Sequence, residues 1–240
     1  MENKTQTFKR KEIKYLIDQQ TKDNFFKVVA SHLAQDSFGK ATIRNIYYDS
    51  PDNRLIRTSI EKPTYKEKLR VRCYNDINSD SKVYIELKKK YDGIVYKRRL
   101  AMKENQIDSF LGRETPAQGQ IQKEVSYFLN FYKNLGPAMY LSYIRDAYFC
   151  KDNSNLRITF DHDIGYRTED LDLISKPYGT ELLSPNTYVM EIKCSDAMPL
   201  WLTSALSKNK IYKESFSKYG KAYLNELKTE KRLIGGQKIA

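Results

Sequence analysis

The sequence predicts an α+β fold, in which eight antiparallel strands close a β-barrel with a polar, basic interior and helices packed around the outside. Three observations support it. Apolar and polar residues alternate with period two in many segments, which is typical of strands with two unlike faces. Turn-forming residues, such as Asp92 and Gly93, separate several of these segments. Segments with apolar residues at helical spacing lie between the predicted strands.

The strands are assigned where the alternation runs between turn signals. The Asp92-Gly93 step joins the fourth and fifth strands as a hairpin, and a stretch rich in Asn, Asp and Ser at 75–81 separates the third from the fourth. Neighbouring strands are therefore expected to be antiparallel. The expected strands are Phe8–Ile17, Thr42–Tyr48, Tyr65–Tyr74, Lys82–Lys90, Ile94–Met102, Ala138–Phe149, Leu156–Tyr166 and Thr187–Cys194.

Helices are assigned from apolar residues three and four positions apart. Phe25, Val29 and Leu33 share one face of the first, and Pro51 suits the first position of the second. The expected helices are Thr21–Ala34, Pro51–Ser59, Glu104–Leu111, Gln118–Asn134, Met198–Leu206 and Ser217–Lys231. We interpret the whole chain, 1–240, as one domain with its core at about 8–223 and a helix end and tail at 224–240.

Charged residues occupy alternating positions in most of the strands, so those of one strand share a face. The opposite face carries apolar residues such as Leu69, Val71 and Cys73. The alternating residues are Arg10, Glu12 and Lys14; Lys66, Lys68, Arg70 and Arg72; Glu86 and Lys88; Lys97 and Arg99; Tyr143 and Arg145; Arg157 and Asp161; and Glu191 and Lys193.

Two arrangements would produce this pattern. An ordinary sheet would turn its charged face to water and its apolar face to a core. A barrel would place the charges inside and offer its apolar outside to the helices, and eight strands suffice to enclose one small ligand. We favour the barrel. Because many confined cations repel one another, the ligand is expected to be a polyanion, specifically a chain of phosphates.

Bulk composition limits the functional classes. Lys and Arg exceed Asp and Glu by 42 to 30, for a net charge of +12, which favours nucleic acid, an anionic membrane or a phosphate-rich molecule as partner. Nucleic acid is disfavoured because the basic residues alternate along strands instead of gathering on a helix. The N-terminus lacks an apolar signal core and no apolar run could span a membrane, so we expect a cytoplasmic protein.

Few residues are available to bind a soft metal. The chain has two His and three widely spaced Cys, Cys73, Cys150 and Cys194, which are expected to be buried thiols. Any metal should therefore be a hard cation held by carboxylates.

Nine segments together resemble a known family. They are FKRKEIKYLI, IRNIYYDSPDNRLI, KEKLRVRCY, VYIELKKK, GIVYKRRL, LSYIRDAYF, LRITFDHDIGYR, VMEIKCS and SFSKYGKAY, in order from about Phe8 to Tyr223. They resemble the catalytic domain of the vacuolar transporter chaperone (VTC) polyphosphate polymerases and its bacterial single-domain relatives, which are triphosphate tunnel metalloenzymes. The resemblance implies a phosphotransferase that moves the terminal phosphate of ATP onto polyphosphate, using Mn²⁺ or Mg²⁺.

The resemblance also implies roles for residues of this chain. Glu191 would bind the metal, with Glu12 and Glu86 as further candidates, although each of these two could equally be a counter-ion for a lysine. The residues implied in catalysis are Arg70, Arg72, Lys88, Arg145 and Arg157. The residues implied in substrate binding are Lys14, Arg10, Lys97, Tyr143, Lys193, Ser217 and Lys218.

Two departures from the family pattern matter. Hydrolytic tunnel enzymes open with Glu-x-Glu-x-Lys, whereas Arg10 stands here in the first carboxylate position, which favours the polymerase branch. Ser215 stands where a basic residue is expected, with Lys213 nearest. Two alternatives stay open: a hydrolase of tripolyphosphate or nucleoside triphosphate with the same fold, and a non-catalytic polyphosphate sensor. A membrane partner that receives the product also stays open.

Overall fold

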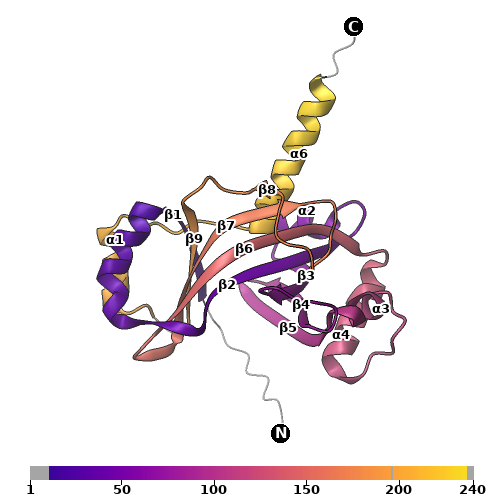
Figure 1. Cartoon of the computed structure of the whole chain (residues 1–240), viewed down its shortest axis with the longest axis horizontal. Helices are drawn as coiled ribbons and strands as arrows, with labels where there is room; N and C mark the ends of the chain where they lie inside the picture. The colour runs from indigo at the N-terminus through magenta and orange to yellow at the C-terminus, as the bar shows by residue number, and fades with distance from the viewer. Residues whose placement is uncertain (1–10, 196, 237–240) are drawn as a thin grey trace.

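The computed structural model describes residues 11–195 and 197–236, in which one large antiparallel sheet is surrounded by helices (Figure 1). The sheet order is β1-β9-β7-β6-β2-β3-β4-β5, and the short β8 pairs with β7. The strands are β1 Lys11–Asp18, β2 Leu33–Asp49, β3 Tyr65–Tyr74, β4 Lys82–Tyr91, β5 Ile94–Lys103, β6 Gly136–Cys150, β7 Asn153–Arg167, β8 Thr180–Glu181 and β9 Thr187–Cys194. The prediction of an antiparallel α+β fold is confirmed.

The prediction of a closed, eight-stranded barrel is wrong. Across the described residues, β1 and β5 end the sheet without pairing with each other, and β8 is a ninth strand. The sheet is nevertheless strongly curled, because Lys88 Nζ on β4 lies 3.2 Å from Glu12 Oε2 on β1. This contact is made by two long side chains, because β1 and β4 are not neighbours in the sheet.

Most expected strands lie where the alternation places them, and β9 has the expected bounds. The first helix was predicted to continue to Ala34, but α1 Gln19–Val29 is followed by the 3₁₀ turn η1 Ala30–His32, and β2 begins at Leu33. Leu33 pairs with Cys150 of β6, and a register shift between Gln35 and Lys40 interrupts this ladder. Pairing with a distant strand therefore overrides the helical spacing of the sequence.

The remaining helices pack on both faces of the curled sheet. They are α2 Arg54–Ile60, η2 Glu104–Gln106, α3 Ile107–Leu111, α4 Gly119–Tyr132, α5 Leu200–Lys208 and α6 Lys218–Gly236. The α1 and α5 helices share one apolar core with β1, β7 and β9, and α3 and α4 share a second with β3 and β4. The α6 helix extends away from the body of the molecule (Figure 1). None of the helices in the described ranges is long and apolar enough to cross a bilayer.

A third apolar core lies on the same face of the sheet as the alternating charges. It joins Tyr47 and Tyr143 to Ile56 of α2 and to Tyr219 and Ala222 of α6. The α2 helix is fixed there by Asp49, whose carboxylate accepts hydrogen bonds from its first backbone N–H groups. The three cysteines, Cys73, Cys150 and Cys194, are buried as expected. The third core thus holds the start of α6 against the charged face.

Candidate functional site

Charged side chains from seven strands and the start of α6 form one connected set, which we call the basic cluster. Its cations are Lys14, Lys68, Arg70, Arg72, Lys88, Lys97, Arg99, Arg145, Lys193 and Lys218, and its carboxylates are Glu12, Glu86, Asp161 and Glu191. The ten cations exceed the four carboxylates by six charges in this set. Charged side chains from separate strands therefore lie close together on one face of the sheet.

Glu86 is the centre of one half of the basic cluster. Its carboxylate is 1% exposed and lies 2.6 Å from Arg70, 2.6 Å from Lys97, 2.5 Å from Arg99 and 3.9 Å from Arg72. Burial alone would raise the pKa of Glu86, but the charges of Arg70, Arg72 and Lys97 outweigh it and hold the pKa well below its usual value. Glu86 is therefore an anion with both oxygens engaged.

Tyr47 and Lys68 extend this half towards α6. Arg70 donates a hydrogen bond of 3.0 Å to the Tyr47 hydroxyl, and the Tyr47 ring stacks on Tyr219 with centroids 4.3 Å apart. Burial opposes ionisation of Tyr47, but the adjacent charges of Arg70 and Lys68 lower its pKa to about 8. Burial also lowers the pKa of Lys68 to about 8. Both groups therefore titrate close to neutral pH.

Asp161 is the centre of the second half. Its carboxylate is fully buried, accepts two hydrogen bonds of 2.5 and 2.7 Å from Arg145, and lies 2.6 Å from Lys218 Nζ. Although burial would raise the pKa of Asp161, Lys218 and Arg145 lower it to about 2. Tyr143 joins the halves, because its hydroxyl accepts a hydrogen bond of 3.1 Å from Arg72 while Lys218 lies over its ring.

Glu191 and Glu12 form a third carboxylate centre, on β9 and β1. Lys193 Nζ lies 3.2 Å from Glu191 and 3.7 Å from Glu12, so the two carboxylates share one lysine. Burial would raise the pKa of Glu191, but Lys193, Lys14 and Arg145 together lower it. Burial lowers the pKa of Lys14 itself, which is paired with Glu191 in the strand register.

The start of α6 is attached to the basic cluster by lysines. Ser217 Oγ accepts hydrogen bonds from Lys68 Nζ at 3.1 Å and from the backbone N–H of Gly220 at 3.2 Å, so it caps the helix. Lys14 Nζ donates to the Phe216 carbonyl at 2.9 Å. Ser217 and Lys218 therefore lie beside the strand residues of the basic cluster.

The implied metal can be tested against the three carboxylate centres. The described residues contain no group of three or more His, Cys, Asp or Glu side chains placed to hold an ion. Mg²⁺ and Mn²⁺ sites of phosphate-handling proteins commonly use one or two carboxylates, with phosphate oxygens and water completing the shell. Glu191, which pairs with Lys193, and Glu12, which contacts Lys193 and Lys88, fit this requirement. Glu86 does not fit, because four cations surround it.

One predicted residue of the described part of the chain, Arg157, is not part of the connected set. Arg157 is half-exposed and binds Asp36 at 2.7 Å, although its register partner on β9 is Lys193 of the basic cluster. Arg10 lies outside the described residues. Arg157 therefore lies at the edge of the basic cluster, which we call its rim.

Sequence reasoning left four residues of the site out of the predicted set: Lys68, Arg99, Asp161 and Tyr47. For the first three the period-two alternation gave the signal, since each shares a face with a predicted residue. Tyr47 is uncharged, so the alternation of charged residues gave no signal for it.

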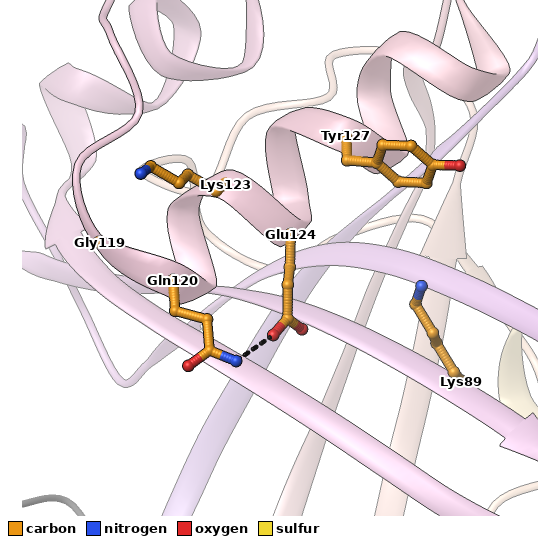
Figure 2. Close-up of a pocket in the computed structure, with 6 residues that line it drawn as sticks. All are labelled: Lys89, Gly119, Gln120, Lys123, Glu124 and Tyr127. Carbon is orange, nitrogen blue, oxygen red and sulfur yellow. Dashed lines mark hydrogen bonds between the residues drawn. The ribbon is translucent and has the colours of Figure 1, made fainter.

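A separate pocket lies on the other face of the sheet, between β4 and α4 (Figure 2). It has a volume of about 490 Å³ and is lined by Lys89, Gly119, Gln120, Lys123, Glu124 and Tyr127. Lys89 follows Lys88 along β4 and so points to the opposite face. Glu124 accepts hydrogen bonds from Gln120 and from Arg98, which reduces the positive charge there. The pocket is therefore distinct from the basic cluster.

The solved structures that match this chain have remote sequences. A Bacillus halodurans protein described as a candidate adenylate cyclase is 14% identical, with a TM-score of 0.53 over 87% of this chain and 95% of that one. A Vibrio parahaemolyticus protein of the same description is 14% identical, with a TM-score of 0.46 over 91% and 99%. A Mimivirus capping enzyme triphosphatase is 12% identical, with a TM-score of 0.36 over 82% and 88%. The first likeness shows the fold alone.

Family membership rests on the sequence. A search of curated proteins gives no significant match. The family model described as the VTC domain matches residues 9–225, which is almost the whole chain. The resemblance of the nine segments is thereby confirmed, and this chain belongs to the VTC domain family.

Proposed function

We propose that this protein is a polyphosphate polymerase that transfers the terminal phosphate of ATP to the end of a polyphosphate chain. One observation carries the proposal: ten cations and only four carboxylates converge on one face of a curled sheet. Such an excess of confined positive charge favours a ligand with many negative charges close together. Membership of the VTC domain family supports the same ligand class.

The arginines and lysines of the cluster would bind the phosphates. Arg70, Arg72 and Arg145 offer planar donors that suit bidentate contacts, while Lys88 and Lys97 act as point charges. Arg157 and Lys193, paired in register, would guide the chain at the rim. This arrangement is suited to holding three or more linked phosphates.

The acceptor chain would bind near the start of α6. Lys14, Ser217 and Lys218 lie together there, beside Tyr143. The attacking group is a terminal phosphate oxygen of the acceptor, which is already ionised, so the reaction needs no general base. A new P–O–P bond forms at the chain end, the bond between the β-phosphate oxygen and the γ-phosphorus of ATP breaks, and ADP leaves.

The cluster would accelerate this step by position and charge. Phosphoryl transfer requires attacking and leaving oxygens in line and neutralisation of the charge that develops between them. The residues proposed to hold Mn²⁺ or Mg²⁺ are Glu191 and Glu12. When bound, the cation would neutralise part of the charge of the phosphates. Glu86 is assigned instead as a counter-ion that keeps its four cations in place.

Incubation of the purified protein with ATP and Mn²⁺, followed by gel sizing of the products, tests the proposal. We expect ADP and long polyphosphate. Orthophosphate as the only phosphate product would show a hydrolase, and binding of polyphosphate without ADP formation would show a sensor. Arg72→Ala should lower turnover by a factor equivalent to about 2–4 kcal/mol, by analogy with lost oxyanion donors. Wild-type turnover by both Arg72→Ala and Glu191→Ala would contradict the mechanism.

A further inference from the structure

Thr159 of β7 carries a buried hydroxyl that none of the described residues satisfies. The residue is 9% exposed, and its Oγ1 has no hydrogen-bond partner. Buried hydroxyls are normally paired, since an unpaired one loses its hydration without compensation. A hydrogen-bond partner for this hydroxyl would have to come from beyond the described residues.

The strand register places Thr159 among residues of the basic cluster. It lies between Asp161 and Arg157 on the same face of β7, opposite Glu191 on β9 and opposite Ala147 on β6. The Glu191 position is followed on the far side by Lys14 of β1. Thr159 is thus at the centre of the wall that β6, β7 and β9 contribute to the charged face.

The charges around Thr159 identify the kind of partner. Arg145, Arg157 and Lys193 occupy diagonal or adjacent positions of the same wall. Asp161 forms ion pairs with Arg145 and Lys218, and Glu191 forms one with Lys193. Neither carboxylate accepts a hydrogen bond from the hydroxyl. Ala147, its register partner on β6, has only a methyl side chain and offers the hydroxyl no hydrogen-bonding group. A ligand oxygen that carries negative charge suits this position.

We propose that the Thr159 hydroxyl donates a hydrogen bond to a non-bridging oxygen of the bound phosphate chain. This inference rests on the proposed function, because it requires condensed phosphate at the basic cluster. The hydroxyl is neutral, so it adds a directional contact without adding charge. It would fix the position of one phosphate along the row that includes Arg145 and Arg157.

Thr159→Val removes the hydroxyl and keeps the shape of the side chain, which allows a test in two measurements. Titration calorimetry with tripolyphosphate in the absence of metal should show affinity about tenfold weaker or more, as expected for a hydrogen bond to a charged group. Thermal unfolding without ligand should show an unchanged or higher melting temperature, because an unsatisfied polar group has been removed. Thr159→Ser should bind within about threefold of wild type. Thr180→Val, at an exposed threonine on β8, is the matched control and should not change affinity.

Several outcomes would overturn the inference. Affinity of Thr159→Val within twofold of wild type would do so, as would lower melting temperatures of both Thr159→Val and Thr159→Ala with equal loss of binding, which would indicate a structural role. Weakened Mn²⁺ binding without phosphate, at unchanged tripolyphosphate affinity, would place the hydroxyl at the cation site instead. A wild-type protein that binds tripolyphosphate but forms no polymer contradicts the proposed function alone, and the predicted loss in Thr159→Val would still support the inference. A wild-type protein that binds no tripolyphosphate contradicts both.

Discussion

Glu86 and Glu191 are both buried carboxylates of the basic cluster, and they differ in the number of cations that contact them. Glu86 has Arg70, Lys97 and Arg99 within 2.6 Å. Glu191 has Lys193 at 3.2 Å and shares that lysine with Glu12. Both residues are buried glutamates, so the number of cations in contact with the carboxylate oxygens distinguishes them. A saturated carboxylate can only hold its partners in place, whereas a less saturated one can exchange a lysine for a metal ion.

The comparison predicts two kinds of mutational effect. Loss of Glu86 would leave four cations in contact without a counter-ion, so the damage should appear in the stability of the ligand-free protein. Loss of Glu191 would remove one candidate metal ligand, so the damage should appear in turnover and metal affinity. If loss of Glu86 affected mainly turnover and loss of Glu191 affected mainly stability, the number of contacting cations would not distinguish the two carboxylates.

The largest effect is expected for Glu86→Gln. Breaking a buried ion pair by removing one partner typically costs about 3–5 kcal/mol, and here four cations lose the same partner. Urea unfolding of the ligand-free variant should show a loss of this size. Saturating tripolyphosphate should restore much of it, because the phosphates replace the missing negative charge.

Glu124→Gln is the matched control for Glu86→Gln. Glu124 pairs with Arg98 at 2.7 Å on the outer face of the sheet, where both side chains are partly exposed. Loss of this pair should cost about 0–1 kcal/mol, with no rescue by tripolyphosphate. Equal losses of unfolding free energy in the two variants would show that Glu86 stabilises the protein no more than an ordinary surface ion pair.

Glu191→Gln should affect turnover most. Loss of one group that stabilises charge in the transition state costs about 2.7–4 kcal/mol, equivalent to roughly 100- to 1000-fold in turnover. Stopped assays with ATP and Mn²⁺ measure this, and calorimetric titration with Mn²⁺ measures the accompanying loss of metal affinity. Wild-type Mn²⁺ affinity in this variant would reject Glu191 as a ligand.

The sequence was most informative about strands and least about how the sheet ends. Period-two alternation identified β9 with its bounds, since side-chain pattern alone determines a strand's two faces. The start of β2 at Leu33 was missed because its pairing with Cys150 is a contact across more than a hundred residues. The open ends of the sheet were missed for a similar reason. Alternation does not encode whether β1 and β5 meet.

The same limit applies to the site. Alternation placed Arg70, Lys97 and Glu191 on one side of their strands, and the structure brings them into one cluster. It could not show that four cations contact Glu86 while Glu191 has one lysine partner, because that depends on contacts between side chains of different strands. Tyr47 was missed because its function as a partner of Arg70 depends on its neighbours and not on its own charge.

A smaller effect is expected from pH. Burial lowers the pKa of Lys97 to about 7, although Glu86 opposes it, and burial lowers the pKa of Lys68 to about 8. Bound phosphate should raise both values, so binding takes up protons above pH 7 and tripolyphosphate affinity should fall as pH rises from 7 to 9. The slope is at most about tenfold per pH unit for each lysine.

The ligand-free protein should respond to pH in the opposite sense. Between these lowered pKa values and the ordinary lysine value, the unfolded chain binds more protons than the folded one, so stability should rise with pH over that range. The double variant Lys68→Met, Lys97→Met should bind tripolyphosphate more weakly at pH 6 and show a flatter affinity profile. Tripolyphosphate ionises in the same way in titrations of the wild type and of the variant. An unchanged slope of affinity against pH would therefore exclude these lysines as the titrating groups.

The smallest effect on stability is expected for Glu12→Gln, which tests whether the curl of the sheet depends on the contact between β1 and β4. Lys88 and Glu12 are partly exposed, and solvent screens such a pair to about 0–1 kcal/mol. Unfolding in urea should therefore barely change, while Mn²⁺ affinity falls if Glu12 assists Glu191. A loss as large as that of Glu86→Gln would mean that the curl of the sheet depends on this pair. The contact between Glu12 and Lys88 would then hold the basic cluster together, and Glu86 would have only a secondary role.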